Sequence, residues 1–121
     1  MSFSLLTESN APKTFDEVRS AVNPKSLFVK DYDELGLYLI KYMKNKCNME
    51  CEDTRMCRGL VLQKDNHKII CAPPTKSIPF EKCENFATIV DELRFEEFVD
   101  GTMINLCYCE NEKYTGWFHM L

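Results

Sequence analysis

Short apolar runs separated by turn-forming residues constrain this chain more than any other feature of its sequence. The runs at 26–32, 37–43, 56–63 and 69–72 are each shorter than ten residues and contain many Leu, Ile, Val, Phe and Tyr residues. Runs of this length are typical of β-strands, whereas a membrane-spanning helix needs about 18 consecutive apolar residues. The sequence therefore predicts a folded protein built on strands, and we expect no membrane partner.

Helical spacing adds two short helices to this pattern. Thr14 followed by Glu17 has the spacing of a capping box, and Asn23-Pro24 ends the helix that it opens. Apolar residues recur at helical spacing in 84–93 and predict the second helix. The run 37–43 fits either a strand or the end of a helix, because short apolar runs do not separate the two.

Turn residues divide the remaining segments. We expect a loose lead-in over 1–13, a polar loop over 45–54 and the turn of a hairpin over 64–68. Residues 75–80 should be extended. Further strands are predicted over 94–99, 102–109 and 113–121. Because side chains alternate along a strand, Phe98 and Asp100 are expected on one face of the strand 94–99 and its turn. The fold class is α+β with a mostly antiparallel sheet, in a single domain over 1–121 that is either compact or an incomplete piece.

Charge argues against unaided nucleic-acid binding. Fifteen Lys and Arg residues stand against nineteen Asp and Glu, which gives a net charge of −4. The excess is concentrated in 81–112, where nine carboxylates accompany only Lys82 and Arg94. Phosphate binding normally requires a basic surface, and the sequence has no basic stripe.

Seven cysteines raise the question of disulfides or zinc. The first residues lack the basic and apolar regions of a signal peptide, so we expect reduced thiols and a cytoplasmic location, which for a viral protein means the host cytoplasm or the virion. Cys47, Cys51 and Cys57 do not form the paired knuckles of a zinc site, and Cys107-x-Cys109 is too closely spaced for one. No metal site is predicted.

Three positions are candidates for binding an anion or shaping a site. Arg58 precedes Gly59 at the head of a strand, where it can present a fixed charge to a phosphate. Lys76 follows two prolines in a stiff stretch, and Asp100-Gly101 lies between two predicted strands. Each also has a simpler explanation: a surface arginine beside a turn, a solvated lysine, and a common hairpin turn.

Three segments in order resemble a known family. They are Cys57-Arg58-Gly59-Leu60-Val61-Leu62, then Pro74-Thr75-Lys76-Ser77-Ile78-Pro79-Phe80, then the stretch 96–105 with Asp100-Gly101-Thr102-Met103-Ile104-Asn105. Together they resemble the N-terminal part of the RNA ligase branch of the covalent nucleotidyltransferases, nearest to the RNA-ligase-like proteins of large DNA viruses. The resemblance covers about residues 26–117. It implies the N-terminal part of a ligase-like nucleotidyltransferase domain.

The resemblance implies a two-step reaction with ATP and Mg²⁺. A lysine amine attacks the α-phosphate of the nucleotide, and the nucleotide then passes to a polynucleotide 5′ end. By the same resemblance Arg58, Lys76, Asp100 and Gly101 would contact the nucleotide, and Phe98 stands where the family has the lysine of K-x-D-G. A phenyl ring has no nucleophile, and the later motifs of the family are missing.

The sequence therefore leaves two classes of function. The first is a fragment of an RNA-ligase-like nucleotidyltransferase domain, catalytically inactive as it stands, that retains affinity for a nucleotide or RNA. The second is a non-enzymatic accessory or interaction protein, for instance a viral one, that reuses the same scaffold. The lysine missing at position 98 favours the second class, because a fold can outlive its activity.

The cysteine pattern gives the first testable prediction. The protein is purified without reductant and then denatured for thiol titration, which should find close to seven free thiols. Metal analysis should find no stoichiometric zinc. Two blocked pairs of cysteines, or one zinc per chain, would contradict the prediction of a reducing environment.

Overall fold

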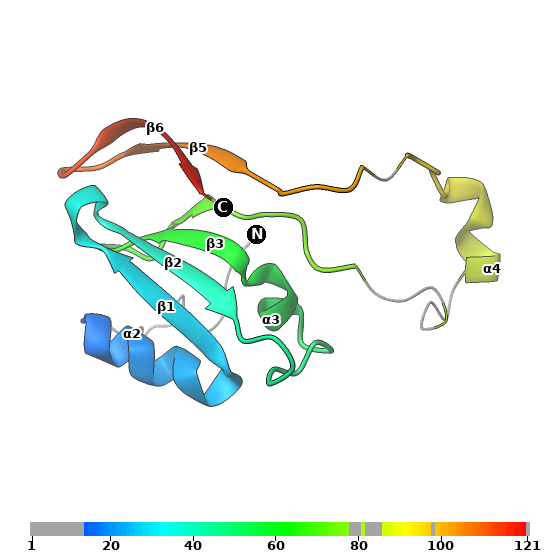
Figure 1. Ribbon diagram of the computed structural model, residues 1–121, viewed down its shortest axis with the longest axis horizontal. Coiled ribbons are helices and arrows are strands. Elements are labelled where there is room, and N and C mark those ends of the chain that lie inside the picture. Colours follow the sequence, from blue (N-terminus) through cyan, green and yellow to red (C-terminus); the bar gives the residue numbers. More distant parts are fainter. Residues whose placement is uncertain (1–13, 78–80, 82–85, 98, 121) are drawn as a thin grey trace.

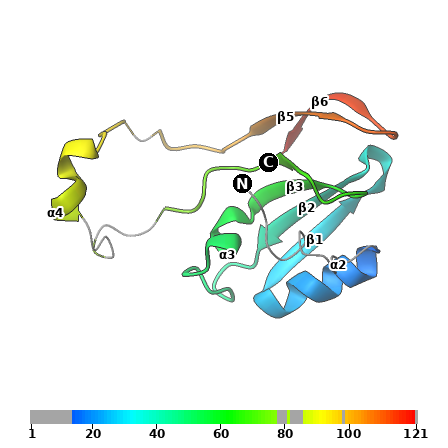
Figure 2. The ribbon, with the colours of Figure 1, turned by 180° about the vertical axis from the view of Figure 1, so that it is seen from behind.

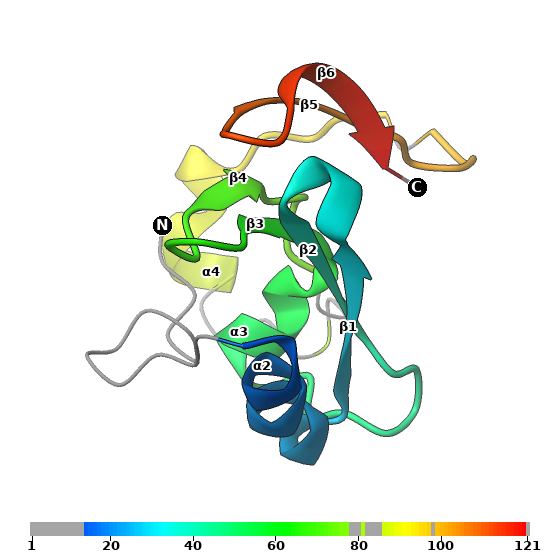
Figure 3. The same ribbon diagram turned by 90° about the vertical axis from the view of Figure 1, so that its left-hand side faces the viewer.

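A four-stranded sheet lies between helices on one face and a β-hairpin on the other (Figures 1 and 3). The computed structural model describes residues 14–77, 81, 86–97 and 99–120. The α+β class and the antiparallel pairing are confirmed, although the strands form two sheets. No helix among these residues is long and apolar enough to cross a membrane.

The first helix begins where the capping pattern predicts. Helix α2 spans Phe15–Val22, and the Thr14 hydroxyl accepts from the Glu17 N–H at 3.3 Å. The Glu17 carboxylate accepts from the Thr14 N–H at 3.2 Å, which completes the capping box. Val18 and Val22 are fully buried against the sheet, and the short 3₁₀ helix η1 (Asn23–Lys25) ends the helix at a proline.

All four strands of the first sheet pair antiparallel in chain order. They are β1 (Leu27–Tyr32), β2 (Leu37–Tyr42), β3 (Arg58–Gln63) and β4 (Ile69–Cys71). The 3₁₀ helix η2 (Asp33–Leu35) and Gly36 make the turn between β1 and β2. The run 37–43 is thus a strand, and the predicted hairpin of β3 and β4 around 64–68 is confirmed.

The two central strands are buried on both faces. In β2, Tyr38 and Ile40 pack with α2, whereas Leu37 and Leu39 pack toward the hairpin. Strand β3 divides in the same way, with Leu60 and Leu62 on the helical face and Val61 on the other. A strand covered on both faces reads as a continuous apolar run, which explains the unbroken Leu, Ile and Val of these segments.

The covering hairpin consists of β5 (Asn105–Glu110) and β6 (Thr115–Met120). Cys107, Cys109 and Met120 are buried against the sheet, while Leu106 and Tyr108 point outward and are exposed. The alternation predicted for 102–109 is therefore present, but the strand begins at Asn105 and its small thiol side chains face the core.

The stretch between β4 and β5 contains the largest departure from the sequence prediction. Helix α4 (Phe86–Ile89) and the 3₁₀ helix η4 (Val90–Glu92) fall within the predicted helix 84–93, and they lie away from both sheets (Figures 1 and 2). The strand prediction for 94–99 is wrong, because 94–97 and 99 are irregular and exposed, with no neighbouring strand to pair. Phe98 lies outside the described residues, so its expected place on one face with Asp100 stays a prediction.

A third helix occupies the end of the predicted polar loop. Helix α3 spans Glu52–Met56, and it buries Thr54 and Met56 beside the start of β3. The prediction of a loop over 45–54 followed by a strand from residue 56 is therefore wrong at this boundary. A five-residue helix with one apolar side chain has almost no helical periodicity to detect.

Burial on both faces of β2 predicts unequal costs for two leucines. Leu39→Ala should lower the free energy of unfolding by about 2–5 kcal/mol, because it leaves a cavity between the sheet and the hairpin. Leu106→Ala removes the same atoms from an exposed site and should cost well under 1 kcal/mol. Urea unfolding of both variants measures the difference, and equal costs would contradict the two-layer core.

Candidate functional site

Arg58 and Lys76, separate in the sequence, lie at one junction of the fold. Arg58 opens β3, and its guanidinium Nη1 reaches the Pro74 carbonyl oxygen at 3.5 Å. The Lys76 backbone N–H donates to the Arg55 carbonyl oxygen at 3.2 Å, which holds residues 74–76 against the end of α3. The structure therefore brings together two of the predicted site residues and adds Arg55 to them.

A β-bulge at Gly59 sets the position of Arg58. The register changes so that Ile40 pairs with Leu60 while Lys41 pairs with Arg58, and Gly59 is left over. Its φ of +110° is one that glycine adopts without strain. Bulges are common where a strand must redirect a side chain next to a binding site. Here the bulge places Arg58 beside Lys41 of the neighbouring strand.

We call these four residues the basic cluster: Lys41, Arg55, Arg58 and Lys76. None of the ion pairs between described residues involves them. The buried Nε of Arg55 also has no hydrogen-bond partner among those residues. The backbone and cross-strand contacts bring four basic residues from four segments to one junction, and several neighbouring cations suit an anion with several negative oxygens, such as a phosphate group.

The Asp-Gly motif is not part of the basic cluster. Asp100 and Gly101 are exposed on the irregular stretch that precedes β5, and a side chain at position 101 would meet no atom within 4 Å. Because the predicted strand 94–99 is absent, no hairpin turn holds them. Asn105, at the end of the same sequence segment, does lie at the junction: its Nδ2 is 3.8 Å from where a Cβ of Gly59 would stand.

Sequence reasoning missed Lys41, Arg55 and Asn105 as members of the junction. Lys41 lies on a strand whose register with β3 depends on the bulge, and Arg55 lies in a helix too short to be recognised. Only Asn105 belonged to a segment already singled out. The convergence is a product of pairing and of the return of the chain after β4, which local patterns do not encode.

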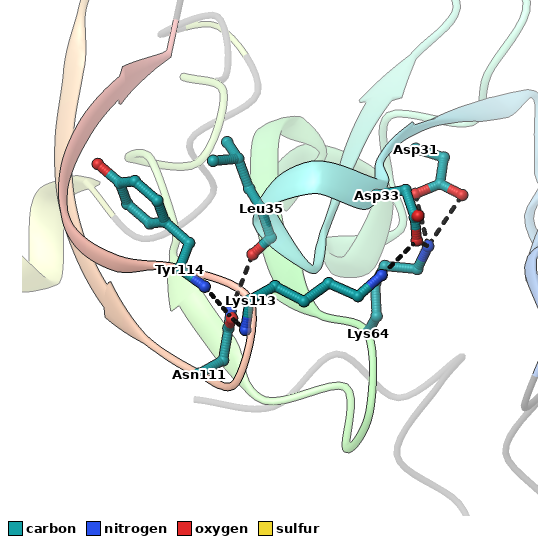
Figure 4. A network of polar contacts seen from close by, with 7 residues as sticks. All are labelled: Asp31, Asp33, Leu35, Lys64, Asn111, Lys113 and Tyr114. Carbon is teal, nitrogen blue, oxygen red and sulfur yellow. Dashed lines mark hydrogen bonds and ion pairs between the residues drawn. The ribbon is translucent and has the colours of Figure 1, made fainter.

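A second group of charged residues lies at the opposite end of β3 (Figure 4). Lys64 Nζ donates to Asp31 Oδ1 at 2.8 Å and to Asp33 Oδ1 at 2.7 Å. Lys113 Nζ reaches the same Asp33 oxygen at 2.9 Å from the turn between β5 and β6. One carboxylate thus links the turn after β1, the end of β3 and the covering hairpin.

An asparagine completes the joint between the layers. Asn111 Nδ2 donates to the Leu35 carbonyl oxygen at 2.9 Å, and its Oδ1 accepts from the Tyr114 N–H at 2.8 Å (Figure 4). Gly36, at φ +67°, lies beneath it, and a Cβ there would come within 3.3 Å of the amide. Glycine is therefore required at position 36 for both its conformation and its space.

The electrostatics of this group favour a structural role. Hydrogen bonds from Lys64 and Lys113 lower the pKa of Asp33 to about 2. Burial by itself lowers the pKa of Lys64, but its hydrogen bonds to Asp31 and Asp33 outweigh burial and raise it. A pocket of about 120 Å³ borders the group, yet its lysines already face carboxylates, so we interpret the group as a joint that holds the hairpin on the sheet.

The described cysteines are free thiols. The Cys47 thiol donates to Met49 Sδ at 3.2 Å and the Cys57 thiol to the Asp53 carbonyl oxygen at 3.1 Å. Burial raises the pKa of Cys57 to about 12, whereas the backbone N–H of Thr54 lowers the pKa of the exposed Cys51. Cys51 is thus the thiol most open to alkylation. Among these residues no His, Cys, Asp and Glu side chains gather as a metal site, and Cys83 lies outside them.

No protein-family model matches the chain, and the searches of curated proteins and of solved structures found no significant match.

The lowered pKa of Asp33 predicts a loss of stability in acid. The contribution is complete above the ordinary aspartate pKa of about 4 and is lost as the pH falls toward about 2, because the unfolded chain takes up the proton first. Urea unfolding at a series of pH values should show a smaller acid loss for Asp33→Asn than for the native chain. Glu34→Gln, an exposed neighbour, should keep the native profile; identical profiles for Asp33→Asn and the native chain would contradict the prediction.

Proposed function

We propose that this chain is the N-terminal portion of an RNA-ligase-like nucleotidyltransferase domain that binds phosphate groups of a nucleotide or an RNA without forming a covalent intermediate. The observation that carries the proposal is the basic cluster. It joins Arg58 and Lys76, the two cations that the family resemblance selects, at one end of β3. Phe98 stands at the position of the family's lysine nucleophile, and a phenyl ring cannot attack a phosphate.

The rest of the charge distribution makes the cluster specific. The chain is acidic overall, so an anion is repelled by most of the surface and is attracted most strongly where several cations come together. Lys64 and Lys113 do not compete for it, because Asp31 and Asp33 already neutralise them. The proposal therefore predicts binding at one end of β3 and none at the other.

This proposal gives no protein ligands to the Mg²⁺ that the resemblance implies. The described residues offer no group of carboxylate, imidazole or thiol side chains that fits a metal. We therefore assign no residue to Mg²⁺ and derive no step through it.

A second candidate function rests on a separate observation. The outward face of β5 and β6 exposes Leu106, Tyr108 and Trp117, which an isolated chain leaves in water. Such a face favours the class of non-enzymatic interaction proteins. The two functions are compatible, because the basic cluster and this face are built from different side chains.

Equilibrium binding tests the proposal directly. Calorimetric titration with ATP and with a short 5′-phosphorylated RNA should show weak, salt-sensitive binding. Arg58→Ala and Lys76→Ala should each weaken it on the order of tenfold, the usual cost of one charge-assisted hydrogen bond. Lys68→Ala provides the matched control, since Lys68 is exposed in the turn beyond the opposite end of β3. Equal effects of all three changes would contradict a localised site.

A labelling assay tests the absence of covalent chemistry. Incubation with radiolabelled ATP or GTP and Mg²⁺ should leave no acid-stable, amine-linked nucleotide on the protein. A labelled band that disappears on replacing Lys76, Lys82 or Lys113 would overturn this part of the proposal and identify a displaced nucleophile.

A further inference from the structure

The outer face of the β5–β6 hairpin is an exposed aromatic surface. Tyr108 and Trp117 are cross-strand partners, and their rings pack edge to face with centroids 5.4 Å apart. Leu106, Tyr108 and Trp117 expose 69%, 47% and 64% of their surface. A folded chain gains nothing by ordering large apolar side chains in water, so a patch of this kind usually marks a contact surface.

The backbone beside this face is also open. Of the described strands, β6 pairs only with β5, which leaves its other edge without a neighbouring strand. An unpaired edge presents a row of N–H and C=O groups that can add one more strand. Trp117 lies on the strand with the free edge, and Tyr108 of β5 packs against its ring, so an added strand would lie beside this aromatic pair.

The edges of the four-stranded sheet carry the usual protection, and β6 does not. Strand β1 has Lys30 and Asp31, and β4 has three residues and is soon followed by Pro73-Pro74. Charge, short length and proline all discourage further pairing. Strand β6 has six residues with neither proline nor any Lys, Arg, Asp or Glu. Its edge therefore fits a strand that is meant to be extended.

The charges around the face indicate the kind of strand that fits. Glu110 points outward with Leu106 and Tyr108, Glu112 follows in the turn, and neither β5 nor β6 contains a lysine or arginine. Lys113, in the same turn, already pairs with Asp33, so a second copy of this chain would bring more carboxylates to the contact and no unpaired cation from this hairpin. A nucleic acid would be repelled for the same reason.

We propose that the free edge of β6 binds an extended segment of a partner protein that alternates apolar with basic side chains. Its backbone adds a strand beside β6, its apolar side chains cover Trp117 and Tyr108, and its cations meet the carboxylates at the hairpin turn. Main-chain pairing supplies affinity and the alternate side chains supply specificity, as in other cases of strand addition.

Trp117 is the one tryptophan of the sequence, so its fluorescence reports on this face directly. The probe is a synthetic peptide that alternates lysine with valine and matches the six residues of β6. Titration should shift the emission to the blue and saturate. Replacing the lysines by glutamates should abolish the response, and N-methylation of alternate backbone nitrogens should weaken binding by at least about tenfold, because pairing is lost.

Variants distinguish this face from the rest of the protein. Tyr108→Lys, which removes the ring that packs on Trp117, should weaken peptide binding by at least about tenfold, whereas Phe28→Lys, at an exposed aromatic on β1, should leave it unchanged. Arg58→Ala should leave peptide binding unchanged as well, which separates this proposal from the phosphate site.

Four outcomes would overturn the proposal. They are an absence of saturable binding at millimolar peptide, an equal response to the glutamate peptide, an equal response to a single-stranded oligonucleotide, and concentration-dependent dimerisation in sedimentation experiments that alone shifts the emission of Trp117.

Discussion

Burial of β2 and β3 on both faces is the constraint on which the rest of the structure depends. Leu39 and Val61 need a cover as much as Ile40 and Leu60 do, and a single helix layer can cover only one face. The hairpin of β5 and β6 supplies the second cover even though a long stretch of chain separates it from the sheet. Its attachment by Asn111 and Lys113 is a consequence of that need, because a two-stranded hairpin is marginal on its own.

The parts of the fold that sequence could predict are those in which local and global preferences agree. The capping box at Thr14 and the hairpin of β3 and β4 are local, and the structure confirms both of them. The strand over 94–99 fails because its apolar residues, Phe95, Phe98 and Val99, do not alternate and none of the described strands pairs with this stretch. Strand pairing is a tertiary property, and β-propensity alone does not create it.

The candidate site, like the fold, could be predicted only in part from the sequence. Arg58 and Lys76 were selected by resemblance and do lie at one junction, but Lys41 joins them only because the bulge leaves Gly59 of β3 without a partner. Without the bulge at Gly59, Arg58 would pair one position further along β2 and would not stand opposite Lys41. The proposed phosphate site thus depends in part on a register irregularity, which a sequence read residue by residue does not reveal.

The excursion between β4 and β5 begins and ends at the same place. Pro74 lies on Arg58, and Asn105 lies on the neighbouring Gly59. A linker of about six residues in place of 77–103 would therefore close a shorter loop between the same two points. The shorter loop loses less conformational entropy on folding, which favours the folded state by about 1 kcal/mol. The layered core and the long excursion are separable in thermodynamic terms, so insertions and deletions in the excursion can accumulate without unfolding the sheet that it leaves and rejoins.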